Sequence, residues 1–194
     1  IIDVKTAIRF LRAHADEYEI DPEHIGIIGR SAGGQLSALA AMNSDGYESE
    51  EWSEYSSHVQ ACCDMFGPVD FVKLIEDDAL EMRTNPDCRW KKPEDTHAGA
   101  LFGGDMSTLK ERAKPYCPPY ILTKEMCPIL ILHGDCDKLV SCSISEAFYD
   151  DIVKAGMEDR ADLYILHGAG HGTKEFFQQE TKEIIRAFFD KNLK

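Results

Sequence analysis

The chain has 194 residues, of which 43% are hydrophobic, and a formal net charge of −14. This length and composition suit one globular domain spanning residues 1–194. The acidic balance argues against nucleic acid or an anionic membrane as a partner, because both are bound through clustered positive charge. No apolar stretch approaches the roughly 20 residues that cross a bilayer, and none reads as a signal peptide.

The seven cysteines are odd in number and include no C-x-x-C pair. Cys62 and Cys63 are adjacent in an apolar run, and neighbouring residues of a strand face opposite sides of the sheet, so the two cannot serve one site. The pattern favours reduced, packed thiols and a cytoplasmic location over a disulfide framework. No histidine or cysteine spacing is typical of a zinc site, so we expect no metal.

The first 42 residues predict a helix, a strand, a sharp turn and a second helix. Apolar residues recur at helical spacing over residues 3–19, which indicates an amphipathic helix. The apolar run at 25–28 predicts a buried strand. A glycine-rich turn at 29–34 then leads into a helix of small and apolar residues at 35–42.

The alternation of strands and helices returns later in the chain. A polar, acidic loop at 43–58 precedes a strand at 59–66, and further strands are expected at 128–133 and 163–166. A helix is expected between Ser143 and Gly156, starting with a capping box formed by Ser143 and Glu146. Phe177 and Phe188 mark a last helix. Strands alternating with helices predict an α/β fold with a mostly parallel, doubly wound sheet and flanking helices.

Residues 71–119 interrupt this alternation with mixed charge, several turns and a helix expected over 71–82. An excursion of this length in a compact domain is often a lid over a functional site. A surface decoration is an equally good interpretation.

The pentapeptide Gly29-Arg30-Ser31-Ala32-Gly33 matches G-x-S-x-G. The match lies between a predicted strand and a predicted helix, which is the setting of a nucleophile elbow. The turn is too sharp to admit side chains beside the serine, which explains the glycines. The amide of Ala32, at the start of the helix, faces negative charge that develops beside Ser31.

A serine hydroxyl needs a neighbouring base, and the base needs a carboxylate that orients it. His171 follows a strand in a glycine-rich loop and is favoured over His167, which ends the strand and suits a packed or turn position. Asp137 lies farther into its loop than Asp135, which an Asx turn can explain, so Asp137 is favoured. The chain order Ser, Asp, His is that of α/β-hydrolases.

Three segments resemble the acetyl-esterase and carboxylesterase branch of the α/β-hydrolases: Asp21 through Gly34, His133 through Val140, and Gly170-His171-Gly172. That branch includes deacetylases of plant-polysaccharide sugars and relatives of aryl formamidases. The resemblance implies Ser31 as nucleophile, Asp137 as acid and His171 as base, with no metal and no organic cofactor.

In that family an earlier part of the domain carries a His-Gly-Gly turn with further oxyanion donors, and this sequence holds no such turn. The remaining family donor is the amide of Ala32, and losing one donor costs on the order of a hundred- to a thousandfold in turnover. The strand at 25–28 would then be an exposed edge. We therefore expect a C-terminal portion of a longer α/β-hydrolase, or a partner such as a second copy that covers this edge.

These features predict a serine carboxylic-ester hydrolase acting on a small-molecule ester, with acetate on a sugar or simple alcohol suggested by the resemblance. An amide or peptide hydrolase is the alternative within enzymes, because the same residues cleave both bonds. A catalytically impaired relative that binds a ligand is the alternative outside them.

Overall fold

In the computed structural model, which describes residues 1–103 and 107–194, four parallel strands form one sheet in the order β1-β2-β3-β4. The strands are β1 Gly26–Arg30, β2 Ala61–Met65, β3 Ile129–Gly134 and β4 Ala161–Leu166. The helices are α1 Ile2–Ala13, α2 Ala15–Tyr18, α3 Ala32–Ala41, α4 Phe71–Thr84, α5 His97–Phe102, α6 Leu109–Ala113, α7 Cys142–Lys154 and α8 Gln179–Asn192, with short 3₁₀ turns at 93–95, 114–116, 118–120, 158–160 and 174–177. The parallel α/β fold class is confirmed.

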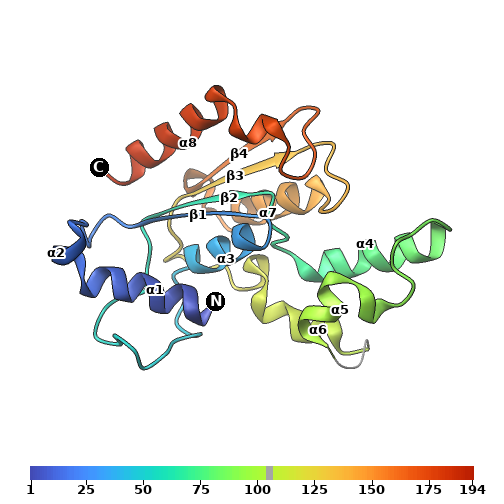
Figure 1. Ribbon diagram of the computed structural model, residues 1–194, viewed down its shortest axis with the longest axis horizontal. Helices are drawn as coiled ribbons and strands as arrows, with labels where there is room; N and C mark the ends of the chain where they lie inside the picture. The colour runs from blue at the N-terminus through green and yellow to red at the C-terminus, as the bar shows by residue number, and fades with distance from the viewer. Residues whose placement is uncertain (104–106) are drawn as a thin grey trace.

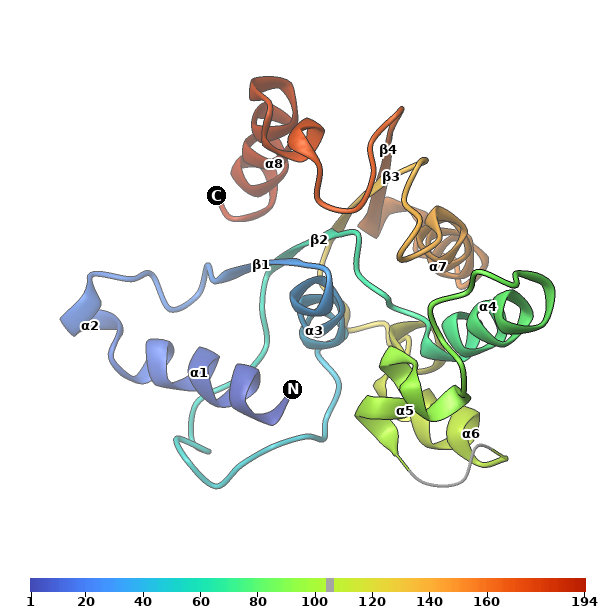
Figure 2. The same ribbon diagram turned by 45° about the vertical axis from the view of Figure 1, so that its right-hand side comes forward.

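Helices cover both faces of the sheet (Figures 1 and 2). Residues of α1, α3, α4 and α7 pack on one face in a core that contains Cys62, and α8 packs on the other face in a core that contains Cys63. The two adjacent cysteines therefore point to opposite faces, as their places in a strand require. All seven cysteines carry free thiols, and five of them are buried.

The expected helix over residues 3–19 is in fact two helices. The backbone of His14 leaves the helical region at φ −110° and ψ 25°, which ends α1, and Glu19 ends α2 in a left-handed conformation. The ring of His14 stacks on Phe10 and its Nδ1 lies 2.9 Å from the Phe10 carbonyl oxygen, so side-chain contacts compensate for the interrupted helix.

The capping box expected at Ser143 and Glu146 is wrong by two residues. Ser141 is the N-cap of α7, and its hydroxyl accepts from the amide of Ser143 at 3.4 Å. Ser143 lies in the first turn instead, and its hydroxyl contacts that of Ser141 at 2.8 Å. The helix ends at Lys154, just before Gly156 with its positive φ of 74°, as expected for a stop signal.

The excursion at 71–119 begins with α4, as predicted. Asp70 caps this helix, because its carboxylate accepts from the amides of Val72 and Lys73. Helices α4, α5 and α6 lie together beside the carboxyl ends of the strands (Figure 1). Residues 104–106 of the expected lid lie outside the described residues. That the segment at 71–119 acts as a lid stays a prediction.

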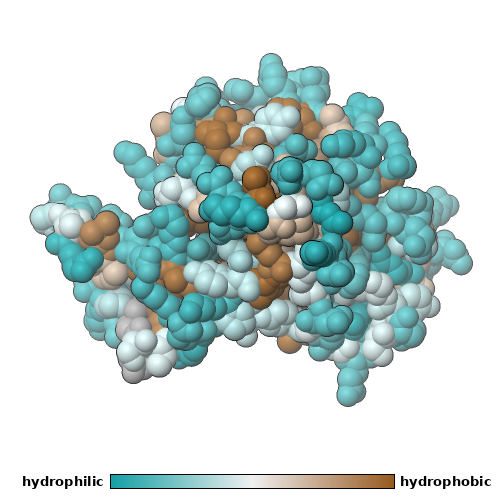
Figure 3. All heavy atoms as spheres, turned by 180° about the vertical axis from the view of Figure 1, so that it is seen from behind, coloured by the Kyte–Doolittle hydropathy of each residue, from teal (hydrophilic) through white to brown (hydrophobic). Residues whose placement is uncertain are grey.

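Polar residues predominate on the face seen in Figure 3, where hydrophobic surface occurs in separate patches. This surface agrees with the 29% of charged residues in the chain. None of the helices among residues 1–103 and 107–194 combines the length and apolarity that a bilayer span requires.

Candidate active site

Ser31 lies between the last residue of β1 and the first residue of α3. Its φ is 53° and its ψ is −123°, and a positive φ of this kind is rare for a residue with a side chain and costs on the order of 1–3 kcal/mol. Its amide donates to the carbonyl oxygen of Met65 at 2.9 Å, which ties the turn to β2. The sheet therefore maintains the strained turn that presents the hydroxyl.

The two glycines of the pentapeptide have different roles, which corrects the expectation that both leave room for the turn. A Cβ on Gly29 would lie 2.0 Å from the carbonyl oxygen of Gly33, whereas a Cβ on Gly33 would meet nothing within 4 Å. Gly34 has less space than Gly33, since a Cβ at position 34 would lie 2.2 Å from Oδ1 of Asp64. The close approaches that need glycine are at positions 29 and 34.

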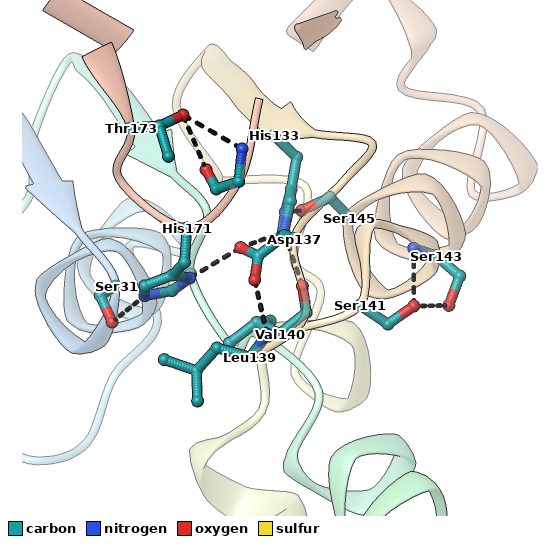
Figure 4. A network of polar contacts seen from close by, with 12 residues as sticks. Ser31, His133, Asp137, Leu139, Val140, Ser141, Ser143, Ser145, His171 and Thr173 are labelled. Atoms are coloured by element: carbon teal, nitrogen blue, oxygen red, sulfur yellow. Dashed lines mark hydrogen bonds and ion pairs between the residues drawn. The ribbon is translucent and has the colours of Figure 1, made fainter. Parts of the chain in front are cut away.

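The structure brings Ser31, His171 and Asp137 together from three separate segments (Figure 4). His171 Nε2 lies 2.9 Å from Ser31 Oγ, and His171 Nδ1 lies 2.7 Å from Asp137 Oδ2. A carboxylate only accepts, so Nδ1 carries the proton and Nε2 is free to accept from the serine hydroxyl. This is the hydrogen-bond order of a catalytic triad.

The rejected candidates pair with each other instead. His167 Nδ1 lies 2.8 Å from Asp135 Oδ2, and Asp135 Oδ1 accepts from the amide of Gly168 at 2.7 Å. The His167 side chain is 87% exposed, so it is a surface turn residue and not a packed one. Asp135 stabilises the loop of His167 rather than forming a local Asx turn.

The carboxylate of Asp137 is fully buried but receives several donors. Oδ1 accepts from the amides of Leu139 at 2.8 Å and Val140 at 3.0 Å. Burial by itself would raise the pKa of Asp137, but contacts with His133, these two amides and His171 outweigh it and lower the pKa to about 2. The group is thus ionised over the whole range in which enzymes usually work.

Two residues that sequence reasoning left without a role touch this triad. Phe66 directly follows β2 with a φ of 46°, and its ring packs against that of His171 with centroids 4.7 Å apart. His133, near the end of β3, lies 3.3 Å from Asp137 Oδ2. The available signals were the Phe66-Gly67-Pro68 strand ending and the position of His133 just ahead of the two aspartates.

Ala32 is the first residue of α3, so its amide is one of the helix donors that have no carbonyl partner within the helix. A cavity of about 990 Å³ opens beside Ser31 and Ala32. Its walls come from α3, α4, α5 and the loop after Asp137, and they are mainly apolar side chains such as Leu36, Leu39, Phe71, Leu74, Phe102 and Leu139. The excursion therefore forms much of the wall.

No group of three or more histidine, cysteine or acidic residues among residues 1–103 and 107–194 is arranged to hold a metal ion. The chemistry that these residues support is transfer of an acyl group to a serine, with a paired base and an amide donor for the oxyanion.

Comparisons with known proteins identify the family of the chain. The chain matches the BD-FAE family over residues 1–152. It is 31% identical over 156 residues to the probable carboxylic ester hydrolase LipM of Mycobacterium tuberculosis, covering 78% of this chain and 33% of LipM. Esterase LipC of the same organism is 28% identical over 174 residues, covering 89% of this chain and 40% of LipC. The chain thus spans well under half the length of these curated relatives.

Solved structures of esterases have the same fold. A truncated carbohydrate esterase from gut microbiota is 30% identical, with a TM-score of 0.77 over 98% of this chain and 67% of that one. The butyrate-bound esterase Est2 of Thermogutta terrifontis is 26% identical, with a TM-score of 0.71 over 98% of this chain and 64% of that one. With its family match extending over most of its length, this chain belongs to the BD-FAE family and has the α/β-hydrolase fold of carboxylesterases.

Proposed function

We propose that this chain carries a serine carboxylic-ester hydrolase site in which Ser31 is the nucleophile, His171 the base and Asp137 the acid that orients His171. The observation that carries the proposal is the continuous hydrogen-bonded path from Ser31 Oγ through both ring nitrogens of His171 to Asp137 Oδ2. The names of the relatives, which are esterases, favour an ester as the substrate.

The reaction follows from the proton positions. Ser31 Oγ attacks the ester carbonyl while its proton passes to Nε2 of His171, and the imidazolium that forms is stabilised by the ionised Asp137. The Ala32 amide stabilises the oxyanion. Nε2 then returns the proton to the leaving alcohol, which leaves an acyl group on Ser31. A water molecule, deprotonated by His171, attacks this acyl group, and the acid departs as Ser31 is reprotonated.

The Ala32 amide is the one oxyanion donor that the resemblance assigns to this sequence, and in other enzymes the loss of one such donor costs about 3–4 kcal/mol. We therefore propose that a second donor comes from a segment outside residues 1–194. The proposed substrate is an ester that joins a small acyl group such as acetyl to a sugar or simple alcohol. The similarity to a carbohydrate esterase from gut microbiota supports a sugar as the alcohol. The cytoplasmic location also stays a proposal that rests on the free thiols.

Hydrolysis of p-nitrophenyl acetate tests the assignment. We expect Ser31→Ala and His171→Ala to lower kcat by about 10⁴-fold or more, and Asp137→Asn by about 10³- to 10⁴-fold. His167→Ala and Asp135→Asn are matched controls from the neighbouring pair, and they should keep the wild-type rate. Turnover that survives Ser31→Ala undiminished would reject Ser31 as the nucleophile.

Substrate choice is tested separately with the same protein. An acetylated sugar, which is an ester, should be hydrolysed with a higher kcat/KM than an acetyl arylamide, which carries the same acetyl group on an amide. A higher value for the arylamide would favour an amide hydrolase instead.

A further inference from the structure

His133 is a fully buried histidine that the reaction above does not use. It lies in the second-last position of β3, between the loop that carries Asp137 and helix α7. Its Nδ1 is 2.7 Å from Ser145 Oγ in α7, and its Nε2 is 3.0 Å from the carbonyl oxygen of Val140 (Figure 4). Burying a ring with two polar atoms is costly unless both have partners, and here both do.

The partners of His133 determine where its proton lies. Nε2 faces a carbonyl oxygen and, at 3.3 Å, the carboxylate of Asp137, and both of these groups only accept. Nε2 therefore carries a hydrogen. Nδ1 faces a hydroxyl, which can donate to it, so Ser145 stabilises the tautomer that presents N–H to Val140 and Asp137. Asp64 in β2 is the other buried carboxylate whose charge acts on His133.

Oδ2 of Asp137 thus lies between two imidazoles, with His171 Nδ1 at 2.7 Å and His133 Nε2 at 3.3 Å. His133 also secures the loop on the other side of the carboxylate. The Val140 amide donates to Asp137 Oδ1, and the Val140 carbonyl accepts from His133. The ring therefore contacts Asp137 directly and also holds a residue that donates to it.

We propose that His133 is a positioning residue that holds the Asp137 carboxylate against His171, with Ser145 setting its tautomer. The inference rests on the proposed function, because it assigns a role within that site. Without the ring, a space opens beside Oδ2 and the Val140 carbonyl loses its donor. The carboxylate can then turn away from His171, which loses the anion that stabilises its imidazolium.

Three variants and one control separate this role from simple packing. His133→Leu keeps a buried apolar side chain but removes both nitrogens. His133→Gln restores an amide N–H near the position of Nε2. Ser145→Ala removes the hydroxyl that sets the tautomer, and Ser143→Ala removes a hydroxyl from the same turn of α7 that does not touch His133. Thermal unfolding of each variant identifies those that are folded at the assay temperature.

For His133→Leu we expect kcat/KM to fall about ten- to a hundredfold, mainly through kcat. The acid limb of its pH profile should move to lower pH by about half a unit or more, because His171 loses the nearby negative charge. His133→Gln should recover most of the rate, Ser145→Ala should shift the limb in the same direction by less, and Ser143→Ala should match wild type.

The titration of the His171 ring by ¹H–¹⁵N NMR gives the same information without turnover. A shift in the His171 titration with no esterase activity in the wild type would support the positioning role and reject the proposed function. An unmoved limb and titration in folded His133→Leu would overturn the positioning role. A move to higher pH would overturn it as well, since it would mean that His133 weakens the contact between Asp137 and His171.

Discussion

At the scale of single residues, space and solvation decide which positions beside Ser31 can vary. Gly29 lies against the backbone of Gly33, while Gly33 faces open space. Asp64 is buried in β2 next to Gly34 and Gly67, and it receives one hydrogen bond, from the amide of Gly67 at 3.0 Å. Its Oδ2 is buried and has no hydrogen-bond partner among residues 1–103 and 107–194. Gly29 has no space for a side chain, whereas Asp64 has a buried carboxyl oxygen that is removed from water.

Gly29→Ala should destabilise the protein by about 2–3 kcal/mol or more, because its Cβ would overlap the Gly33 backbone and neither segment can move freely. Gly33→Ala is the matched control. It should leave stability unchanged or raise it by about 0.5–1 kcal/mol, since Gly33 lies in the first turn of α3. Urea denaturation of both variants measures the difference, and equal stabilities would contradict this account of the elbow.

Asp64 should make stability depend on pH. Burial raises the pKa of Asp64 to about 7, although the hydrogen bond from the Gly67 amide acts in the opposite direction. A group whose pKa is higher in the folded state than in the unfolded state stabilises the fold fully at pH values below its unfolded pKa, which is near 4 for an aspartate. This contribution is lost as the pH rises through the folded pKa of about 7. From pH 4 to 8 the loss is on the order of 4 kcal/mol at most.

Asp64→Asn should remove this dependence, because the amide keeps an acceptor for Gly67 but does not ionise. We expect the variant to be more stable than wild type at pH 8 and no more stable at pH 4. Asp16→Asn, at an exposed position of α2, is the control and should follow wild type. Urea denaturation at both pH values measures the effect. Parallel curves for wild type and Asp64→Asn would show that Asp64 does not titrate in this range.

At the scale of elements, the excursion places its helices next to the nucleophile through local capping. Asp70 ends the loop after β2 and caps α4, and Phe71 in the first turn of that helix lines the cavity. The start of α4 therefore sets one wall of the site.

Asp70→Ala should lower the free energy of unfolding by about 1 kcal/mol, because two amides at the start of α4 lose their acceptor. Asp77→Ala is the control on the same helix, where a partly exposed carboxylate lies 3.9 Å from Lys73 Nζ, and such surface pairs contribute little. Thermal unfolding compares the two variants. Equal losses would mean that the cap does not stabilise α4.

At the scale of the whole molecule, the described part of the sheet ends at β1 on one side and β4 on the other. Among the described residues β1 pairs only with β2, and Ile28 on this strand is 49% exposed. An apolar edge strand of this kind offers free backbone groups to another strand. The second copy or additional segment expected there stays a prediction.

We expect this chain by itself to associate at rising concentration through the β1 edge. Ile28→Lys should weaken that association, because a lysine on an edge strand opposes strand pairing. Sedimentation velocity over a concentration series measures it, with Val153→Lys as the matched control, because Val153 is an exposed apolar residue of α7, a helix that contacts β3 and β4. A monodisperse monomer of the unmodified chain at every concentration would contradict the prediction.

The sequence by itself determined the four strands, the longer helices and their order along the chain, but not the short helices α5 and α6. Spacing of apolar residues, strand-length apolar runs and the glycines around Ser31 are local signals, and local backbone preferences respond to them directly. The errors were local too, such as the break at His14 and the cap at Ser141, where neighbouring hydroxyls and rings offer nearly equivalent hydrogen bonds.

The sequence favoured His171 and Asp137, but only the tertiary structure shows that the two side chains meet the serine. Ser31 and His171 are 140 residues apart, and Asp137 and His171 are 34 apart, so their contact depends on the order of the strands and the paths of their loops. The same holds for His133, whose partners come from a loop and from α7, and for Phe66, which contacts His171 from the end of β2. Such contacts arise when the sheet assembles, because the carboxyl ends of parallel strands converge at one edge regardless of local sequence.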